Sequence, residues 1–157
     1  MNVFTVSLFG HRTIEDMWDL HINLSRVIEE LIRSKSYVSF LIGRQGEFDE
    51  YAASVIKSVR KGLGTESSDI SLVLPYVVAD IEFYEKYYDD IIIPDGVEKM
   101  YPKQAIRFKN RWMIERSDLV IVNVERESGG AYDALQYARK LNKSTVNLCD
   151  MKRERKI

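Results

Sequence analysis

One stretch of the sequence, residues 118–141, most restricts the folds open to this chain. It begins with an apolar run at residues 119–122, which is typical of a strand buried on both faces. The pair Gly129-Gly130 follows a short polar loop, and apolar residues then recur at helical spacing up to Leu141. The junction between strand and helix is either a plain tight turn or a site where free backbone N–H groups bind an anion.

The rest of the chain repeats this alternation of strand and helix. Apolar, β-rich runs predict four more strands, at residues 2–9, 37–42, 70–74 and 143–149. Helical spacing predicts a helix after each of the first two strands and another over residues 103–117. Residues 80–90 fit a short helix or an irregular arm, and residues 90–94 fit an extra strand or a buried loop. Thr13 is expected to cap the first helix and Cys149 to close the last strand.

Strands that alternate with helices predict a parallel sheet with right-handed crossovers. We therefore expect an α/β fold, a three-layer, doubly wound and mainly parallel sheet of Rossmann-like type with strand order 3-2-1-4-5. The length of 157 residues suits a single domain. We assign residues 1–150 to this domain and residues 151–157 to a basic C-terminal tail, interpreted as solvated and frayed rather than as a phosphate-contacting arm.

Composition restricts the partners and the compartment. The formal net charge is −1, so no overall field attracts nucleic acid or a membrane, and we expect neither as a partner. Cys149 is the single cysteine, which leaves no intrachain disulfide and no cysteine zinc cluster. The sequence shows no charged leader with a cleavage site and no apolar run of membrane-spanning length, so we expect a cytoplasmic protein.

Three glycine turns are expected to meet at one edge of this sheet. In the order 3-2-1-4-5, the first strand is central, between the second strand and the strand that follows Asp118. Their carboxyl ends lead into residues 10–12, 43–46 and 128–130, each of which contains glycine. Ligands of doubly wound sheets bind at this edge, where the strand order reverses. The convergence of three such turns predicts a ligand-binding site.

The first turn, Gly10-His11-Arg12, offers two side chains for chemistry. Gly10 lets the backbone approach a ligand closely, and Arg12 can pair with a phosphate. His11 either donates a hydrogen bond and takes part in acid–base work, or is a loop histidine satisfied by the backbone.

The second turn and the 103–117 helix add further candidates. Arg44 adds positive charge, and Asp49 either caps the following helix or supplies a carboxylate for ribose hydroxyls or for catalysis. The charged side chains of the 103–117 helix are expected to be mostly solvated, with one or two over the sheet edge. The predicted ligand-binding residues are Gly10, His11, Arg12, Gly43, Arg44, Gly46, Asp49, Asn110, Ser128, Gly129, Gly130 and Ala131.

Several familiar motifs are absent from the sequence. There is no GxGxxG after the first strand, no GxxxxGK[ST] and no GxSxG. No group of His, Asp, Glu or Cys has clear metal-ligand spacing, so no metal site is predicted. No cofactor is predicted beyond a nucleotide-derived ligand.

Taken together, the motifs resemble the SLOG (SMF/DprA–LOG) superfamily, and most closely its YpsA-like branch. The resemblance extends from Val3 to about Leu148. Its pieces are Gly10-His11-Arg12; Gly43, Gly46, Phe48, Asp49 and Ala52; Pro75-Tyr76; Asn110, Met113, Ile114, Ser117 and Asp118; and Ser128-Gly129-Gly130 with Ala134 and Ala138. The resemblance implies a Rossmann-like fold with a pocket for a nucleotide-derived ligand, often in a homo-oligomer. Several branches are thought to be ligand sensors.

The chain departs from the phosphoribohydrolase branch, which carries Pro-Gly-Gly-x-Gly-Thr-x-x-Glu at the glycine turn. Here the threonine is absent, and Gln136 or Leu135 occupies the acidic position. Ala131 also replaces the threonine that is usual after Gly-Gly in the YpsA-like branch. These changes remove a hydroxyl and a carboxylate, and they count against glycosidic cleavage by that mechanism.

Three functions follow from this sequence. The first is a cytosolic binding or sensor domain for a nucleotide or sugar-phosphate ligand, more consistent with a binding protein than with an enzyme. The second is a hydrolase or transferase of an N-glycosidic bond, with His11 and one carboxylate among Glu47, Asp49 and Glu127 as catalytic candidates. The third is a ligand-free interaction module that uses the tyrosine-rich residues 84–88 and the basic tail.

Overall fold

The computed structural model describes residues 2–155, with side chains described up to Met151. Strands and helices alternate along this part of the chain. The strands are β1 (Val3–Gly10), β2 (Tyr37–Ile42), β3 (Ser68–Val73), β4 (Asp90–Ile92), β5 (Leu119–Asn123) and β6 (Ser144–Asn147). The helices are α1 (Met17–Ser34), α2 (Glu47–Leu63), α3 (Ile81–Tyr87), α4 (Pro102–Glu115), α5 (Gly130–Lys140) and α6 (Leu148–Arg155).

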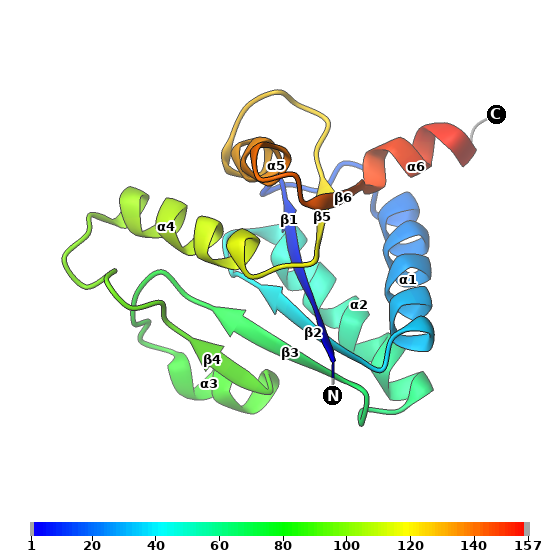
Figure 1. The fold of residues 1–157 in the computed structure, drawn as a ribbon, viewed down its shortest axis with the longest axis horizontal. Coiled ribbons are helices and arrows are strands. Elements are labelled where there is room, and N and C mark those ends of the chain that lie inside the picture. Colours follow the sequence, from blue (N-terminus) through cyan, green and yellow to red (C-terminus); the bar gives the residue numbers. More distant parts are fainter. Residues whose placement is uncertain (1, 156–157) are drawn as a thin grey trace.

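The six strands form one parallel sheet in the order β4-β3-β2-β1-β5-β6 (Figure 1). The predicted doubly wound order is confirmed, with β5 and β6 as its fourth and fifth strands. The short run at residues 90–92 is the extra strand, added at the edge beside β3. β1 lies at the centre, paired with β2 on one side and β5 on the other, so the sheet order reverses between β1 and β5.

Helices cover both faces of the sheet and create two hydrophobic clusters. One cluster joins α1 and α2 to the sheet and includes Leu24, Phe40 and Ile56. The other joins α4 and α5 to the opposite face and includes Met113 and Ala138. Figure 1 shows α4 and α5 apart from α1 and α2, across the twisted strands. The expected three layers are therefore present.

Two local predictions were wrong. Asp16, not Thr13, caps α1, because the Asp16 carboxylate accepts a hydrogen bond of 3.0 Å from the Asp19 N–H. Cys149 lies in helix α6 rather than at the end of a strand. Asn147 ends β6, because its amide oxygen accepts hydrogen bonds from the N–H groups of Val124 and Cys149 and so turns the chain into a helix.

The helix α6 crosses the predicted boundary between domain and tail at residue 150. The basic side chains from residue 152 onward lie outside the described residues, and so does the backbone of residues 156–157. The assignment of a separate tail therefore stays a prediction. Within residues 2–155, no helix has the length and apolar character needed to cross a membrane.

Candidate functional site

A cavity of about 390 Å³ opens at the carboxyl edge of the sheet, next to the switch between β1 and β5. All three predicted turns contribute to it, together with one face of α4. The residues that line it are Phe9, Gly10, His11, Arg12, Thr13, Gln45, Asp49, Ile106, Lys109, Asn110, Arg126, Gly129, Gly130 and Ala131. The structure thus brings together at one edge segments that are widely separated in the sequence.

Glycines bring the floor of the cavity close to the core. A Cβ on Gly10 would overlap the Phe48 ring, which is only 1% exposed. A Cβ on Gly46 would lie 2.7 Å from the Arg12 Cα, so the turns after β1 and β2 touch through their backbones. The Glu47 N–H also donates a hydrogen bond of 2.8 Å to the Arg12 carbonyl. Close packing of these two turns therefore fixes the position of Arg12 at the cavity.

Lys109 is the most unusual side chain of the site. It projects from the buried face of α4 and is 1% exposed. A Cβ on Gly43 would lie 2.6 Å from the Lys109 Nζ, so the absence of a side chain at Gly43 makes room for the ammonium group. Burial lowers the pKa of Lys109 to about 8, and the nearby Asp49 carboxylate only partly offsets that effect. Among the described residues, none accepts a hydrogen bond from this ammonium group.

Asp49 faces the same cavity from the first turn of α2. Its Oδ2 accepts a hydrogen bond of 2.8 Å from the Gln45 N–H. Burial raises the pKa of Asp49, while the charge of Lys109 and this hydrogen bond act in the opposite direction. No direct ion pair joins the two side chains in the described structure. Lys109 therefore retains hydrogen-bonding capacity for an anion, and a bound anion would favour its protonated form.

We expected most α4 charges to be solvated and one or two to lie over the sheet edge, and Lys109 is a charge of the second kind. The sequence did carry a signal for this residue, because Lys109 lies four positions after Ala105 and four before Met113, and both are buried. A lysine within the apolar stripe of a helix must either reach solvent or enter a polar cavity. Asn110, which was predicted, lines the cavity as well, and its buried Oδ1 has no partner among the described residues.

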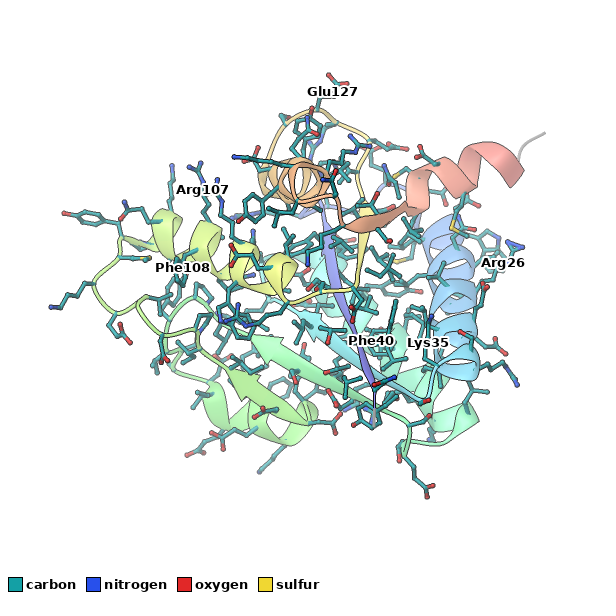
Figure 2. All side chains as sticks on the ribbon, viewed as in Figure 1. Arg26, Lys35, Phe40, Arg107, Phe108 and Glu127 are labelled. Carbon is teal, nitrogen blue, oxygen red and sulfur yellow. The ribbon has the colours of Figure 1, made fainter. Side chains whose placement is uncertain are left out.

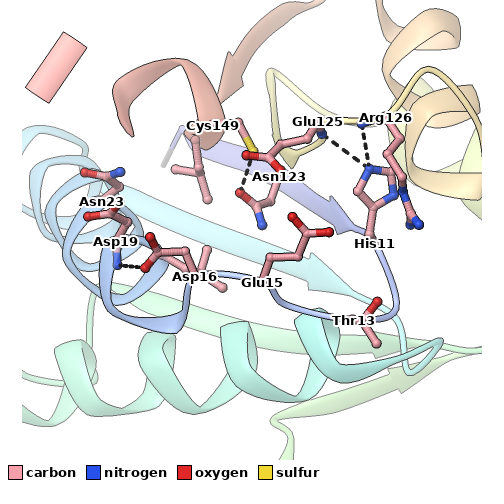
Figure 3. Close-up of a pocket in the computed structure, with 12 residues that line it drawn as sticks. His11, Thr13, Glu15, Asp16, Asp19, Asn23, Asn123, Glu125, Arg126 and Cys149 are labelled. Carbon is pink, nitrogen blue, oxygen red and sulfur yellow. Dashed lines mark hydrogen bonds between the residues drawn. The ribbon is translucent and has the colours of Figure 1, made fainter. Parts of the chain in front are cut away.

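His11 closes one side of the cavity. Its Nε2 accepts hydrogen bonds from the N–H groups of Glu125 and Arg126, each 3.3 Å long (Figure 3). His11 is thus a loop histidine satisfied by the backbone, one of the two interpretations left open by the sequence. Burial and the nearby Arg126 lower its pKa, which favours the neutral ring that this acceptor role requires. Arg126 itself lines the cavity and was missed, because nothing in its sequence context separates it from a solvated loop residue.

A second, smaller cavity of about 40 Å³ lies on the other side of His11. Figure 3 shows it between the start of α1, the end of β5 and Cys149. Asn23 lines it, 1% exposed, and its Oδ1 has no partner among the described residues. The volume suits ordered water. Throughout the described part of the chain, no three His, Cys, Asp or Glu residues are grouped to hold a metal ion.

The structure places several predicted site residues outside the larger cavity. Arg44 turns toward α3, where its Nε donates a hydrogen bond of 3.1 Å to the Tyr84 hydroxyl. Ser128, Glu47 and Glu127 are exposed and do not line the cavity. Gly43 and Gly46 do not line it either, but each packs against a residue that does. Of the candidate catalytic carboxylates, only Asp49 faces the cavity.

Comparison with known proteins identifies the fold. No protein-family model matches the sequence, and no curated protein sequence matches it. The structure is similar to DNA processing protein A (DprA) from Streptococcus pneumoniae, with a TM-score of 0.67 and 13% identity over 90% of this chain and 49% of that one. It is also similar to DprA from Helicobacter pylori, with a TM-score of 0.65 and 15% identity over 97% of this chain and 72% of that one.

The chain has the fold found in DprA. It spans about half the length of the S. pneumoniae protein. This likeness agrees, at a coarse level, with the resemblance to the SLOG superfamily. The assignment to the YpsA-like branch stays a prediction.

The expectation of no nucleic-acid partner was wrong. The H. pylori structure is described as showing a single-stranded DNA binding mode, so a similar fold occurs in a protein that binds nucleic acid. The expectation rested on the net charge of −1, which averages over the whole surface. Nucleic acid responds to the local density of Lys and Arg, and an average near zero does not exclude a basic face.

Proposed function

We propose that the chain is a binding module for a phosphorylated nucleotide unit, held in the 390 Å³ cavity at the carboxyl edge of the sheet. The phosphate would lie between Lys109 and the N-terminus of α5 at Gly130, with Arg12 as a second countercharge. The unit would be either a free nucleotide or part of a single strand of nucleic acid. The single-stranded DNA binding mode described for the H. pylori neighbour supports the second source.

The observation that carries this proposal is the buried ammonium group of Lys109, which has no hydrogen-bond acceptor among the described residues. The Asp49 carboxylate compensates the buried charge only in part, and an anion in the cavity would compensate the rest. Gly129 and Gly130 add backbone N–H groups at the start of α5, and no atom would lie within 4 Å of a Cβ on either residue. Lys109, Gly129 and Gly130 line one cavity, which is therefore open to a ligand from the side of α5.

The geometry favours binding over glycosidic cleavage. Asp49 is the one candidate carboxylate in the cavity, so the cavity lacks the second carboxylate that most glycosidases use. His11 uses its Nε2 to accept two backbone hydrogen bonds, so this nitrogen is occupied. A ligand-free interaction module gains support from the exposed Phe83 near the tyrosines of α3, but it leaves the buried Lys109 unexplained.

Thermal unfolding with added ligands tests the proposal. The probes are the four deoxynucleoside 5′-monophosphates, inorganic phosphate and thymidine. At a hundredfold excess over Kd, a bound nucleotide adds about 2.7 kcal/mol to the free energy of unfolding, which corresponds to a rise in Tm of roughly 5–10 °C. Thymidine, which lacks phosphate, should give no rise.

Lys109→Met removes the charge and should abolish the rise in Tm. Lys61→Met is the matched control, because Lys61 is an exposed lysine in the last turn of α2, outside the cavity. An equal response to nucleotide in the Lys109→Met variant, or no response of the unmodified protein to any phosphate-bearing probe, would contradict the proposal. Native mass spectrometry of the same preparation tests the homo-oligomer, which stays a prediction.

A further inference from the structure

A groove of about 590 Å³ between α4 and α5 continues from the cavity. The two share four lining residues, Arg12, Ile106, Asn110 and Gly130. A ligand seated in the cavity can therefore extend into the groove without leaving the protein surface.

The groove gathers positive charge. Its cationic lining residues are Arg12, Lys103, Arg107, Arg111 and Lys140, while Asp133 is its one carboxylate. Arg111 lies over the Tyr137 ring, 4.7 Å from its centroid. Within the described residues, Lys103, Arg107 and Lys140 form no ion pair. Since the whole chain has a net charge of −1, positive charge is concentrated on this face.

Three of these cations form a row along one face of α4. Lys103, Arg107 and Arg111 are each four residues apart, so successive side chains project from the same face about 6 Å apart along the helix axis. In Figure 2, Arg107 projects from α4 on the side where α5 lies. Like charges at this spacing repel and destabilise a helix. A row of this kind is stabilised by a polyanion that follows the helix.

The cavity differs from the groove in having a closed floor. Lys109 lines this floor with 1% of its surface exposed, and the Phe48 ring packs directly against Gly10 below it. A strand that lies in the groove can place its terminal phosphate at this floor without having to turn back out of the cavity. A terminal phosphomonoester carries about −1.5 to −2 charge at pH 7, more than an internal diester, and it would meet both Lys109 and Arg12.

We infer that the cavity and the groove together bind the phosphorylated end of a single-stranded oligonucleotide. The terminal phosphate occupies the cavity beside Lys109 and Arg12, and the following phosphates run along Lys103, Arg107 and Arg111. This inference rests on the proposed function and narrows its ligand. Binding should be insensitive to base sequence, because the cations of the groove contact phosphate rather than base edges.

Fluorescence anisotropy with a labelled ten-nucleotide oligo(dT) tests this inference. The strand is offered with a 5′-phosphate, with a 3′-phosphate and with neither, over a range of salt concentrations. One of the two phosphorylated strands should bind at least tenfold more tightly than the strand without a terminal phosphate. Equal affinity of all three strands would overturn the inference.

Two variants separate the groove from the cavity. Arg107→Ala should weaken the binding of the phosphorylated strand. It should also reduce the magnitude of the slope of log K against log salt concentration by about 0.7, because one phosphate contact is lost. The same variant should weaken the binding of thymidine 5′-monophosphate far less. Arg26→Ala is the control, since Arg26 is exposed on α1 and belongs to neither the cavity nor the groove (Figure 2).

The outcomes distinguish this inference from the proposed function. If the monophosphate binds but the strand binds no more tightly than it, the groove inference fails and the proposed function stands. If neither the monophosphate nor any strand binds, both fail. If Arg107→Ala weakens the binding of the monophosphate and of the strand equally, the groove makes no separate contact with the strand and the inference fails.

Discussion

The cavity is bounded by two kinds of glycine turn that look alike in the sequence. The turns after β1 and β2 form its floor, and there an added methyl group at Gly10 or Gly46 would collide with Phe48 or with the backbone of Arg12. The turn after β5 forms its rim, and there no atom lies within 4 Å of a Cβ on Gly129 or Gly130. Packing demands glycine at the floor, whereas the rim leaves the same space free.

Glycine at this sheet edge therefore has two separable causes. At the floor, glycine lets two turns and a helix pack together, so substitution should affect folding first. At the rim, glycine leaves backbone N–H groups open to a ligand, so substitution should affect binding first. Three glycine substitutions, a control at Gly62 and a substitution of Lys109 test this separation.

Gly10→Ala should have the largest effect. The methyl group would overlap the Phe48 ring, which is buried among core residues, so the ring or the turn would have to shift. We expect a loss of about 3 kcal/mol in the free energy of unfolding, measured by urea denaturation.

Gly62→Ala is the control for Gly10→Ala, because no atom lies within 4 Å of its added Cβ and it lies within α2. It should stabilise the protein by about 0.5–1 kcal/mol. A Gly10→Ala variant as stable as the unmodified protein would remove the distinction between floor and rim.

Lys109→Met should stabilise the empty protein, although it removes a floor residue. The pKa of Lys109 is lowered from 10.5 to about 8, so at pH 7 its burial costs on the order of 3 kcal/mol, which methionine avoids. Between about pH 8 and 10.5 the unfolded state binds the Lys109 proton more tightly than the folded state does. The free energy of unfolding of the unmodified protein therefore rises with pH over that range, relative to that of the variant. Urea denaturation at pH 7 and pH 10 measures the gap, and a gap that does not narrow at pH 10 contradicts the assignment.

Gly129→Ala should cost about 2 kcal/mol for a reason unrelated to packing. Gly129 has φ of 92° and ψ of 175°, a conformation that is essentially restricted to glycine. The loss should appear in urea denaturation as a shift in midpoint with an unchanged m-value. A cost as large as that of Gly10→Ala would show that the rim is also constrained by packing.

Gly130→Ala should have the smallest effect on stability, within about 0.5 kcal/mol. Gly130 begins α5 without a left-handed backbone, and an added methyl group meets no other atom. Its effect should fall on ligand binding instead, as a weaker nucleotide-dependent rise in Tm. If stability falls and nucleotide binding does not, Gly130 serves packing rather than ligand binding, which contradicts the proposed role of the rim.

The sequence predicted the sheet order because each buried strand is an apolar run and each is followed by a turn. It predicted that three turns would meet because the carboxyl ends of parallel strands share an edge. The side-chain directions within those turns were not predictable in the same way. Arg44 and Arg12 each follow a glycine closely, yet Arg44 turns away to Tyr84 while Arg12 lines the cavity.

Burial of individual polar residues also needed the structure. Lys109 belongs to a helix with several basic residues, and the burial of its side chain depends on the room that Gly43 leaves in the turn after β2. The start of α6 was missed because Asn147, which accepts a local hydrogen bond from the Cys149 N–H, is also held by a hydrogen bond from the distant Val124 N–H. Both cases depend on contacts between distant segments, which local spacing does not encode.

The two hydrogen bonds accepted by His11 allow the opening of the loop after β5 to be measured without any ligand. The amide protons of Glu125 and Arg126 face a ring nitrogen on a different segment, so each exchanges with solvent only when the loop separates from His11. The exchange rates of these two amides therefore report how often the rim of the cavity opens.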